Sequence, residues 1–83
     1  MRPRISLQPI EVLTASQDRE GRLVLADGML VAVLVRLRDE AHDPLLRGAW
    51  YLETGFGLLY GRHELFASLE EAAASIEGWL NQD

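Results

Sequence analysis

The chain has 83 residues, a net charge of −5 and no cysteine, so we expect one small domain, 1–83, without disulfides, thiolate catalysis or cysteine-based zinc sites. The acidic balance argues against nucleic-acid binding, because phosphates bind to basic surfaces. No apolar run approaches the roughly 20 residues that span a bilayer, and the first residues lack the apolar stretch of a secretory signal. These exclusions favour a cytoplasmic protein with no membrane contact. All eight basic residues are arginine, which favours a bacterial source with a G+C-rich genome.

The N-terminal segment is expected to be peripheral. Residues 1–9 contain Pro3 and Pro9, and proline lacks the N–H that a sheet ladder needs, so we predict a flexible arm or an edge strand. The alternation of apolar and polar residues predicts a first short strand over 10–14. The polar stretch 15–20 then reads as a turn that leads into the centre of the chain.

Two aliphatic runs flank the pair Asp27–Gly28. Asp-Gly between apolar runs predicts a two-residue hairpin turn, in which both central residues take φ > 0. Such a turn pairs Ala26 with Met29 and Val24 with Val31. Because side chains alternate along a strand, one face of this hairpin should carry Arg22, Val24, Ala26, Met29, Val31, Val33, Val35 and Leu37. The other face should carry Leu23, Leu25, Leu30, Ala32 and Leu34.

Both faces of the predicted hairpin are therefore apolar. An antiparallel sheet with one solvated face alternates apolar and polar residues, so each face here needs a cover. A C-terminal helix can cover one face, and the N-terminal arm or a second copy of the chain must cover the other. An exposed apolar patch of this size marks an association site, and we predict a homodimer with sheet faces or edges at its interface. The alternative is a monomer that carries aliphatic residues on its surface.

Loops and short strands alternate after the hairpin. Acidic residues, a proline and a glycine interrupt the apolar pattern over 39–48, which predicts a loop. Its ten residues exceed the usual hairpin connection, and loops of that length are often functional. A glycine-rich turn or bulge is predicted over 55–57, and a last short strand over 58–60. Between loop and turn, the aromatic alternation of 49–54 predicts a strand whose one face carries Trp50, Leu52 and Thr54.

A helix is predicted from Ser68 to about Asn81. Ser68 is a good N-cap residue and Glu71 follows it by three positions, which completes a Ser-x-x-Glu capping box. An apolar stripe recurs at helical spacing, formed by Leu69, Ala72, Ala73, Ile76, Trp79 and Leu80. Together the elements predict an α+β fold, with a small antiparallel sheet of three to five strands and one C-terminal helix packed across one face.

No residue pattern indicates catalysis or a metal. The pairs His42–Asp43 and His63–Glu64 join a histidine to a carboxylate, but neighbours on an extended chain point in opposite directions. No His-x-x-x-His spacing is present, and the serines lack a Gly-x-Ser-x-Gly context. We therefore expect no catalytic residues, no metal and no cofactor, and the sequence leans away from an enzyme.

Function is then expected to rest on binding. The leading hypothesis is a non-catalytic protein-interaction module that self-associates through its sheet. Its alternative is a small-ligand or anion-binding module built from the 39–48 loop and two aromatic residues, Tyr51 and Phe56, since aromatic side chains line pockets and interfaces alike. A local anion-binding patch is a further option at Arg36, Arg38 and Arg47, unless the acidic residues around them neutralise it. For the leading hypothesis we assign the interaction surface to Val24, Met29, Val31, Val33, Val35, Tyr51 and Phe56.

The tripeptide Trp50-Tyr51-Leu52, with Pro44 to Gly48 before it, resembles the signature strand of WYL domains, the ligand-sensing modules of bacterial regulators. The resemblance is confined to 44–52. The basic positions that follow in that family have no counterpart here, and the helix after Ser68 departs from its pattern, so no function is carried over from it.

Overall fold

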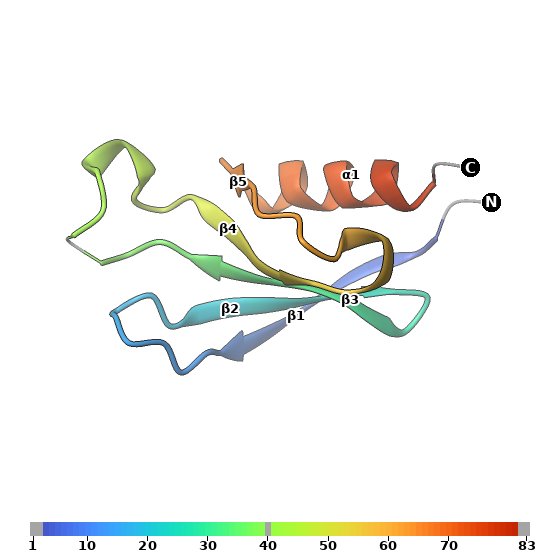
Figure 1. Ribbon diagram of the computed structural model, residues 1–83, viewed down its shortest axis with the longest axis horizontal. Coiled ribbons are helices and arrows are strands. Elements are labelled where there is room, and N and C mark those ends of the chain that lie inside the picture. Colours follow the sequence, from blue (N-terminus) through green and yellow to red (C-terminus); the bar gives the residue numbers. More distant parts are fainter. Residues whose placement is uncertain (1–2, 40, 82–83) are drawn as a thin grey trace.

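One five-stranded antiparallel sheet and one helix make up the fold, as a computed structural model shows for residues 3–39 and 41–81 (Figure 1). The strands lie side by side in chain order, and the helix lies on one face of the sheet. The expected α+β fold is therefore confirmed. In order, the elements are β1 (Ile5–Glu11), β2 (Glu20–Ala26), β3 (Met29–Arg36), the 3-10 turn η1 (Pro44–Leu46), β4 (Trp50–Gly55), the 3-10 turn η2 (Gly57–Leu59), β5 (Leu65–Phe66) and α1 (Leu69–Leu80).

The turn between β2 and β3 is the one predicted. Asp27 has φ 51° and Gly28 has φ 82°, the left-handed values that a type I′ turn requires. Asp27 also fastens the turn to the edge strand, because its Oδ1 accepts a hydrogen bond from the Arg4 N–H at 2.9 Å and its own N–H donates to the Arg4 carbonyl. The pairing of Ala26 with Met29 follows as expected.

The register prediction is wrong beyond that first part of the hairpin. Val24 pairs with Ala32, not with Val31, because the register shifts between Val24 and Leu25. Val31 is thus the extra residue of a β-bulge, which leaves one residue of a strand unpaired. A slip of one residue moves every later side chain to the opposite face. The two predicted faces therefore hold in β2 and are exchanged in β3 after the bulge.

The hydrophobic core lies between the sheet and α1. Val24, Ala32, Leu34 and Leu52 face the helix with no exposed surface. They meet the helical stripe, in which Ala72 and Ile76 are fully buried, together with Leu59 of η2 and Phe66 of β5. Complete burial of a side chain such as Ile76 is worth about 1.5–3 kcal/mol. The amphipathic pattern predicted for the helix thus matches its packing.

The start of α1 follows the predicted capping chemistry with one difference. Ser68 Oγ accepts a hydrogen bond from the Glu71 N–H at 3.1 Å. Glu71 Oε2 accepts from the N–H of Ala67, at 2.9 Å, where a capping box would use the N–H of the N-cap residue itself. The carboxylate therefore ties the helix to the end of β5, one residue further back.

Two strand boundaries and one register differ from expectation. The first strand begins at Ile5 and ends at Glu11, so most of the arm expected over 1–9 is an edge strand, the position where a proline such as Pro9 is tolerated. Residues 58–60 form no strand, because η2 occupies Gly57–Leu59. A second register shift, between Val33 and Leu34, pairs Thr54 with Val33 and moves it away from the face of Leu52.

Candidate self-association surface

The sheet face opposite α1 is apolar across four strands, and we call it the open face. Its members follow from the register, since residues directly opposite each other share a face. In Figure 1, α1 and η2 both lie on the other side of the sheet. Within 3–39 and 41–81, no helix packs on this side. The open face carries Leu23, Leu25, Leu30, Val33, Val35, Tyr51 and Leu65.

The open face is accessible in its middle and along one edge. Leu30 is 39% exposed and Leu65 is 45% exposed, whereas Leu23 and Val33 between them are half-buried. These values are those of side chains that contact their sheet neighbours and have nothing above them. The accessible apolar side chains Leu23, Leu25, Leu30 and Val33 are neighbours across β2 and β3, which distinguishes them from scattered exposed aliphatic residues.

The N-terminal segment covers one end of this face only. A Cβ atom at Gly21 would lie 2.7 Å from Val12 Cγ2, so the Val12 side chain sits over Gly21. Gly21 pairs with Val35, and Val35 is only 2% exposed. The N-terminal segment therefore covers the second apolar face only near Gly21 and Val35. It leaves Leu23, Leu25 and Val33 uncovered.

Polar groups border the apolar centre. Ser6 and Gln8 of β1 lie opposite Leu25 and Leu23 and face the same side. On the other flank, the Tyr51 ring stacks on the His63 ring at a centroid distance of 5.9 Å. A polar rim around an apolar centre is the usual anatomy of a protein interface.

Only part of the interaction surface predicted from the sequence lies on the open face. Val33, Val35 and Tyr51 do, and the bulge explains why Val24 does not, since Val24 is fully buried beneath α1. Val31, at the bulge, is partly buried against the core.

The two remaining predicted residues lie at the ends of strands. Met29 is 68% exposed beside the hairpin turn, and Phe56 is 44% exposed just after β4. The interaction surface predicted from the sequence also omits leucines that lie on the open face. The alternation of residues in β2 does place Leu23 and Leu25 on one face. The bulge that brings Val33 to the same face could not be predicted, because nothing in the residue pattern marks it.

The 39–48 loop is tied down by a buried aspartate. Asp18, 7% exposed, accepts hydrogen bonds from the backbone N–H groups of Arg38 at 2.5 Å and Asp39 at 2.7 Å. His42 Nε2 lies 2.5 Å from the second carboxylate oxygen. Burial raises the pKa of Asp18, but the hydrogen bonds from His42 and the two amides outweigh it and hold the pKa below its usual 3.8. We call this set of contacts the Asp18 clasp.

The clasp joins the β1–β2 connection to the β3–β4 connection at the end of the sheet away from the hairpin turn (Figure 1). His42 therefore has a structural partner. Among residues 3–39 and 41–81, no group of three or more His, Asp or Glu side chains could hold a metal ion. No helix in that same part of the chain is long and apolar enough to cross a membrane.

The residues of the alternative ligand site do not converge. The 39–48 loop precedes β4 and Phe56 follows it, and a strand of six residues separates its two ends by roughly 17 Å at about 3.3 Å per residue. Tyr51 points to the open face, where it stacks on His63. A single small molecule could not contact all three.

No protein-family model, no curated protein and no solved structure matches this chain. The function must therefore be argued from the geometry of the molecule itself.

Proposed function

We propose that the protein is a non-catalytic interaction module that forms a homodimer by packing its open face against the open face of a second copy. The observation that carries the proposal is the accessible apolar surface that neighbouring residues of β2 and β3 form on the side away from α1. Leaving such a surface in water costs free energy, about 25 cal/mol for each Å² of apolar area that association could bury.

The size of the molecule limits how large the interface can be. The molecule measures 41 × 22 × 21 Å, so one whole long side covers on the order of 900 Å², and the open face is only part of that side. Because each partner contributes ~800 Å² to a standard interface, a dimer built on this face belongs to the smaller specific interfaces. Two such sheets would pack about 10 Å apart with their strands within roughly 30° of each other, as in β-sandwiches.

The chemistry of the face also favours a second copy as its occupant. Every paired strand position that the register places on this side is uncharged, including Ser6, Gln8 and Gly21 at its border. In a two-fold dimer each patch meets itself, so a charge on it would face a like charge. The paired positions avoid that repulsion, and the nearest acidic residue in the strands is Glu53, the unpaired residue of the second bulge in β4.

The test is the mass of the protein in solution, measured by light scattering coupled to size exclusion. The wild type should have twice the monomer mass of 9.3 kDa at about 100 μM and dissociate on dilution, since interfaces of this size have dissociation constants that reach the micromolar range. Val33→Asp places a charge in the middle of the open face and should give a folded monomer.

A matched control carries the same new charge away from the open face. Leu45 is 91% exposed on η1, so Leu45→Asp should leave the dimer intact. Leu65→Asp, at the 45% exposed border of the open face, provides a milder second variant in case Val33→Asp fails to fold. A wild type that remains at 9.3 kDa throughout, or a Leu65→Asp variant as dimeric as the wild type, would refute the proposal.

A further inference from the structure

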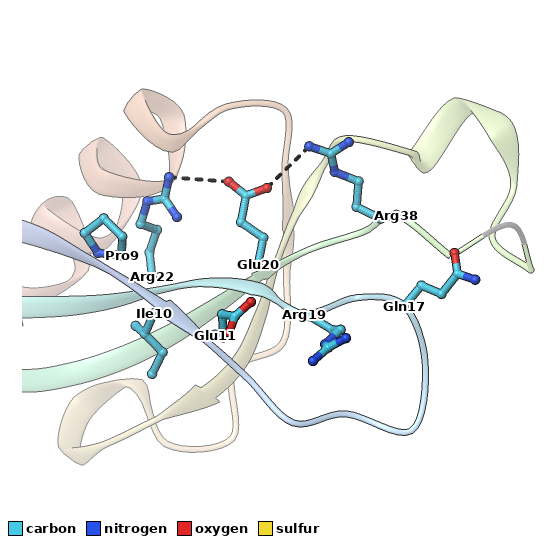
Figure 2. A pocket seen from close by; sticks show the side chains of 8 residues that line it. All are labelled: Pro9, Ile10, Glu11, Gln17, Arg19, Glu20, Arg22 and Arg38. Atoms are coloured by element: carbon cyan, nitrogen blue, oxygen red, sulfur yellow. Dashed lines mark hydrogen bonds and ion pairs between the residues drawn. The ribbon is translucent and has the colours of Figure 1, made fainter.

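Three arginines converge on one carboxylate on the helix-bearing side of the sheet. Glu20 Oε1 lies 3.6 Å from Arg36 Nη1 and 3.4 Å from Arg38 Nη2, and its Oε2 lies 3.5 Å from Arg22 Nη2. Figure 2 shows Glu20 between Arg22 and Arg38, with dashed lines to both. We call Arg22, Arg36, Arg38 and Glu20 the arginine cluster.

Trp50 supports two of these guanidinium groups. The Cζ atoms of Arg22 and Arg36 lie 5.0 Å and 5.7 Å from the centre of the indole ring, within the range of cation–π attraction. Trp50 is only 5% exposed, so the two arginines cover its ring. The register fixes this arrangement, because Trp50 pairs with Arg36 directly across β3 and β4.

The cluster borders two adjoining hollows that share Glu20 and Arg22. One, of about 300 Å³, lies between Trp50 and the start of α1. The other, of about 710 Å³, extends towards β1 and is the hollow drawn in Figure 2. Volumes of 300–1,000 Å³ are typical of small-molecule sites.

The balance of charge leaves the cluster short of acceptors. The side chains that line the two hollows include four arginines and three glutamates, a net charge of +1 in a chain of net charge −5. Arg22 Nη1 donates to the Gly21 carbonyl and Arg36 Nε to the Gly48 carbonyl. The three guanidinium groups still present fifteen N–H donors, more than these two carbonyls and the roughly four acceptor positions of one carboxylate can take. Arg22, Arg36 and Arg38 are also 20%, 35% and 56% exposed, so a ligand in the hollows can reach them.

We propose that this cluster binds a small organic anion, through a carboxylate or phosphate group held by Arg22 and Arg36 above Trp50. Arginine forks match both groups in a bidentate manner. The Glu20 carboxylate lies where that group would bind and keeps the three guanidinium groups aligned, so it competes with the ligand. The site lies on the side of the sheet opposite the open face, and its occupation is independent of dimer formation.

The two tryptophans make the test specific. Inorganic phosphate and citrate are titrated separately at constant ionic strength, and the indole N–H resonances are followed by NMR. Trp79 is an internal control, because the Arg62 guanidinium lies over its ring at 4.1 Å outside the cluster. A saturable shift of the Trp50 resonance with Trp79 unmoved supports the site. Equal shifts of both resonances overturn the proposal. So does a Trp50 resonance that does not saturate with either anion by about 50 mM, a concentration that corresponds to less than ~2 kcal/mol of binding.

Variants separate a binding site from a structural ion-pair network. Glu20→Gln removes the competing charge and should tighten binding at least about fivefold, the effect of two like charges about 4 Å apart when water screens them fully. Arg36→Gln should weaken binding at least about tenfold, since it removes hydrogen bonds from a charged donor. Arg4→Gln, a charge-matched control beside the distant hairpin turn, should change nothing. A Glu20→Gln variant that stays folded and binds no more tightly than the wild type would contradict the proposal.

Discussion

Removing the Asp18 side chain should be among the most damaging single changes that leave the core untouched. In the Asp18→Ala variant, the backbone N–H groups of Arg38 and Asp39 lose their acceptor and His42 loses its partner. Each hydrogen bond to a charged group contributes about 1.5–3 kcal/mol. Water can replace part of this, because the clasp lies at the end of the sheet and the His42 side chain is 32% exposed. We therefore expect a loss of about 2–3 kcal/mol.

Urea unfolding measures this loss. A domain of 83 residues has a free energy of unfolding of about 4–12 kcal/mol at 0.05–0.15 kcal/mol per residue, so the change is a large fraction of the total. With a denaturant slope near 1 kcal/mol/M, the midpoint should fall by about 2–3 M. Asp43→Ala is the matched control, because Asp43 accepts one local hydrogen bond from the Leu45 N–H on the exposed turn η1, and it should cost about 1 kcal/mol or less. Equal losses in the two variants would refute the reasoning.

The same carboxylate predicts the direction of the pH dependence. Its pKa is lower in the folded chain than the usual 3.8, so its contribution is fully present above the pKa of the unfolded chain and is lost as pH falls through the folded value. Asp39 acts in the same direction, since hydrogen bonds from the N–H groups of Ala41 and Gln17 lower its pKa. The stability difference between wild type and Asp18→Ala should therefore shrink as the pH falls below about 4. A difference that stays constant down to pH 2 would contradict this.

Four further substitutions test the packing, each by its thermal or urea midpoint relative to wild type. Ile76→Ala should cost about 2–5 kcal/mol, because Ile76 is fully buried between α1 and the sheet. A loss below about 1 kcal/mol would mean that the helix does not pack on the sheet at this residue. Gly55→Ala should cost about 1–3 kcal/mol, since the new Cβ atom would lie 2.1 Å from the Leu59 carbonyl oxygen. In the helix, the Cβ atom of Gly78→Ala would meet nothing within 4 Å, so this variant should be more stable by up to about 1 kcal/mol. Opposite signs for this pair are the expected result, and the same sign for both would be inconsistent with it. Ser68→Ala should cost about 0.5–2 kcal/mol, because it removes the N-cap hydrogen bond of α1. A variant as stable as the wild type would show that the cap is dispensable.

Local signals predicted the elements that depend on neighbouring residues. Asp27–Gly28 marks its own turn, because few other residues adopt positive φ at both positions. Ser68 and the stripe that contains Ile76 likewise define a helix from short-range spacing alone. The edge strand was harder to place, since Pro9 weakens the strand signal within a segment that pairs along its whole length with β2.

The candidate surface depended on a feature that has no local signal. The two apolar faces of the hairpin were evident from alternation, and so was the need to cover both. Which valines belong to which face depends on the bulge at Val31, and nothing in the run from Met29 to Val35 marks one aliphatic residue as the extra one. The bulge therefore places Val33 beside Leu23 on the open face, opposite to the face on which α1 covers Val24.

Contacts between segments that are far apart in the sequence could not be predicted either, because they too have no local signal. Asp18 looked like one polar residue of a turn, yet its partners lie 20 to 24 positions further along the chain. The arginine cluster includes Arg36 and Arg38, as the anion-patch option suggested, but the third arginine at Glu20 is Arg22 of β2. Sequence spacing predicts neighbours on one element, whereas these groups meet only because β2 and β3 pair in a particular register.

The most direct test of the central claim is an isotope-filtered NOE experiment on a mixture of labelled and unlabelled chains at about 100 μM or above, where an interface of this size should be populated. The account predicts intermolecular NOEs among the methyl groups of Leu23, Leu25 and Val33, because the two open faces pack on each other. Intermolecular NOEs confined to α1, or none at all from a protein of monomer mass, would show that the open face is not the site of self-association.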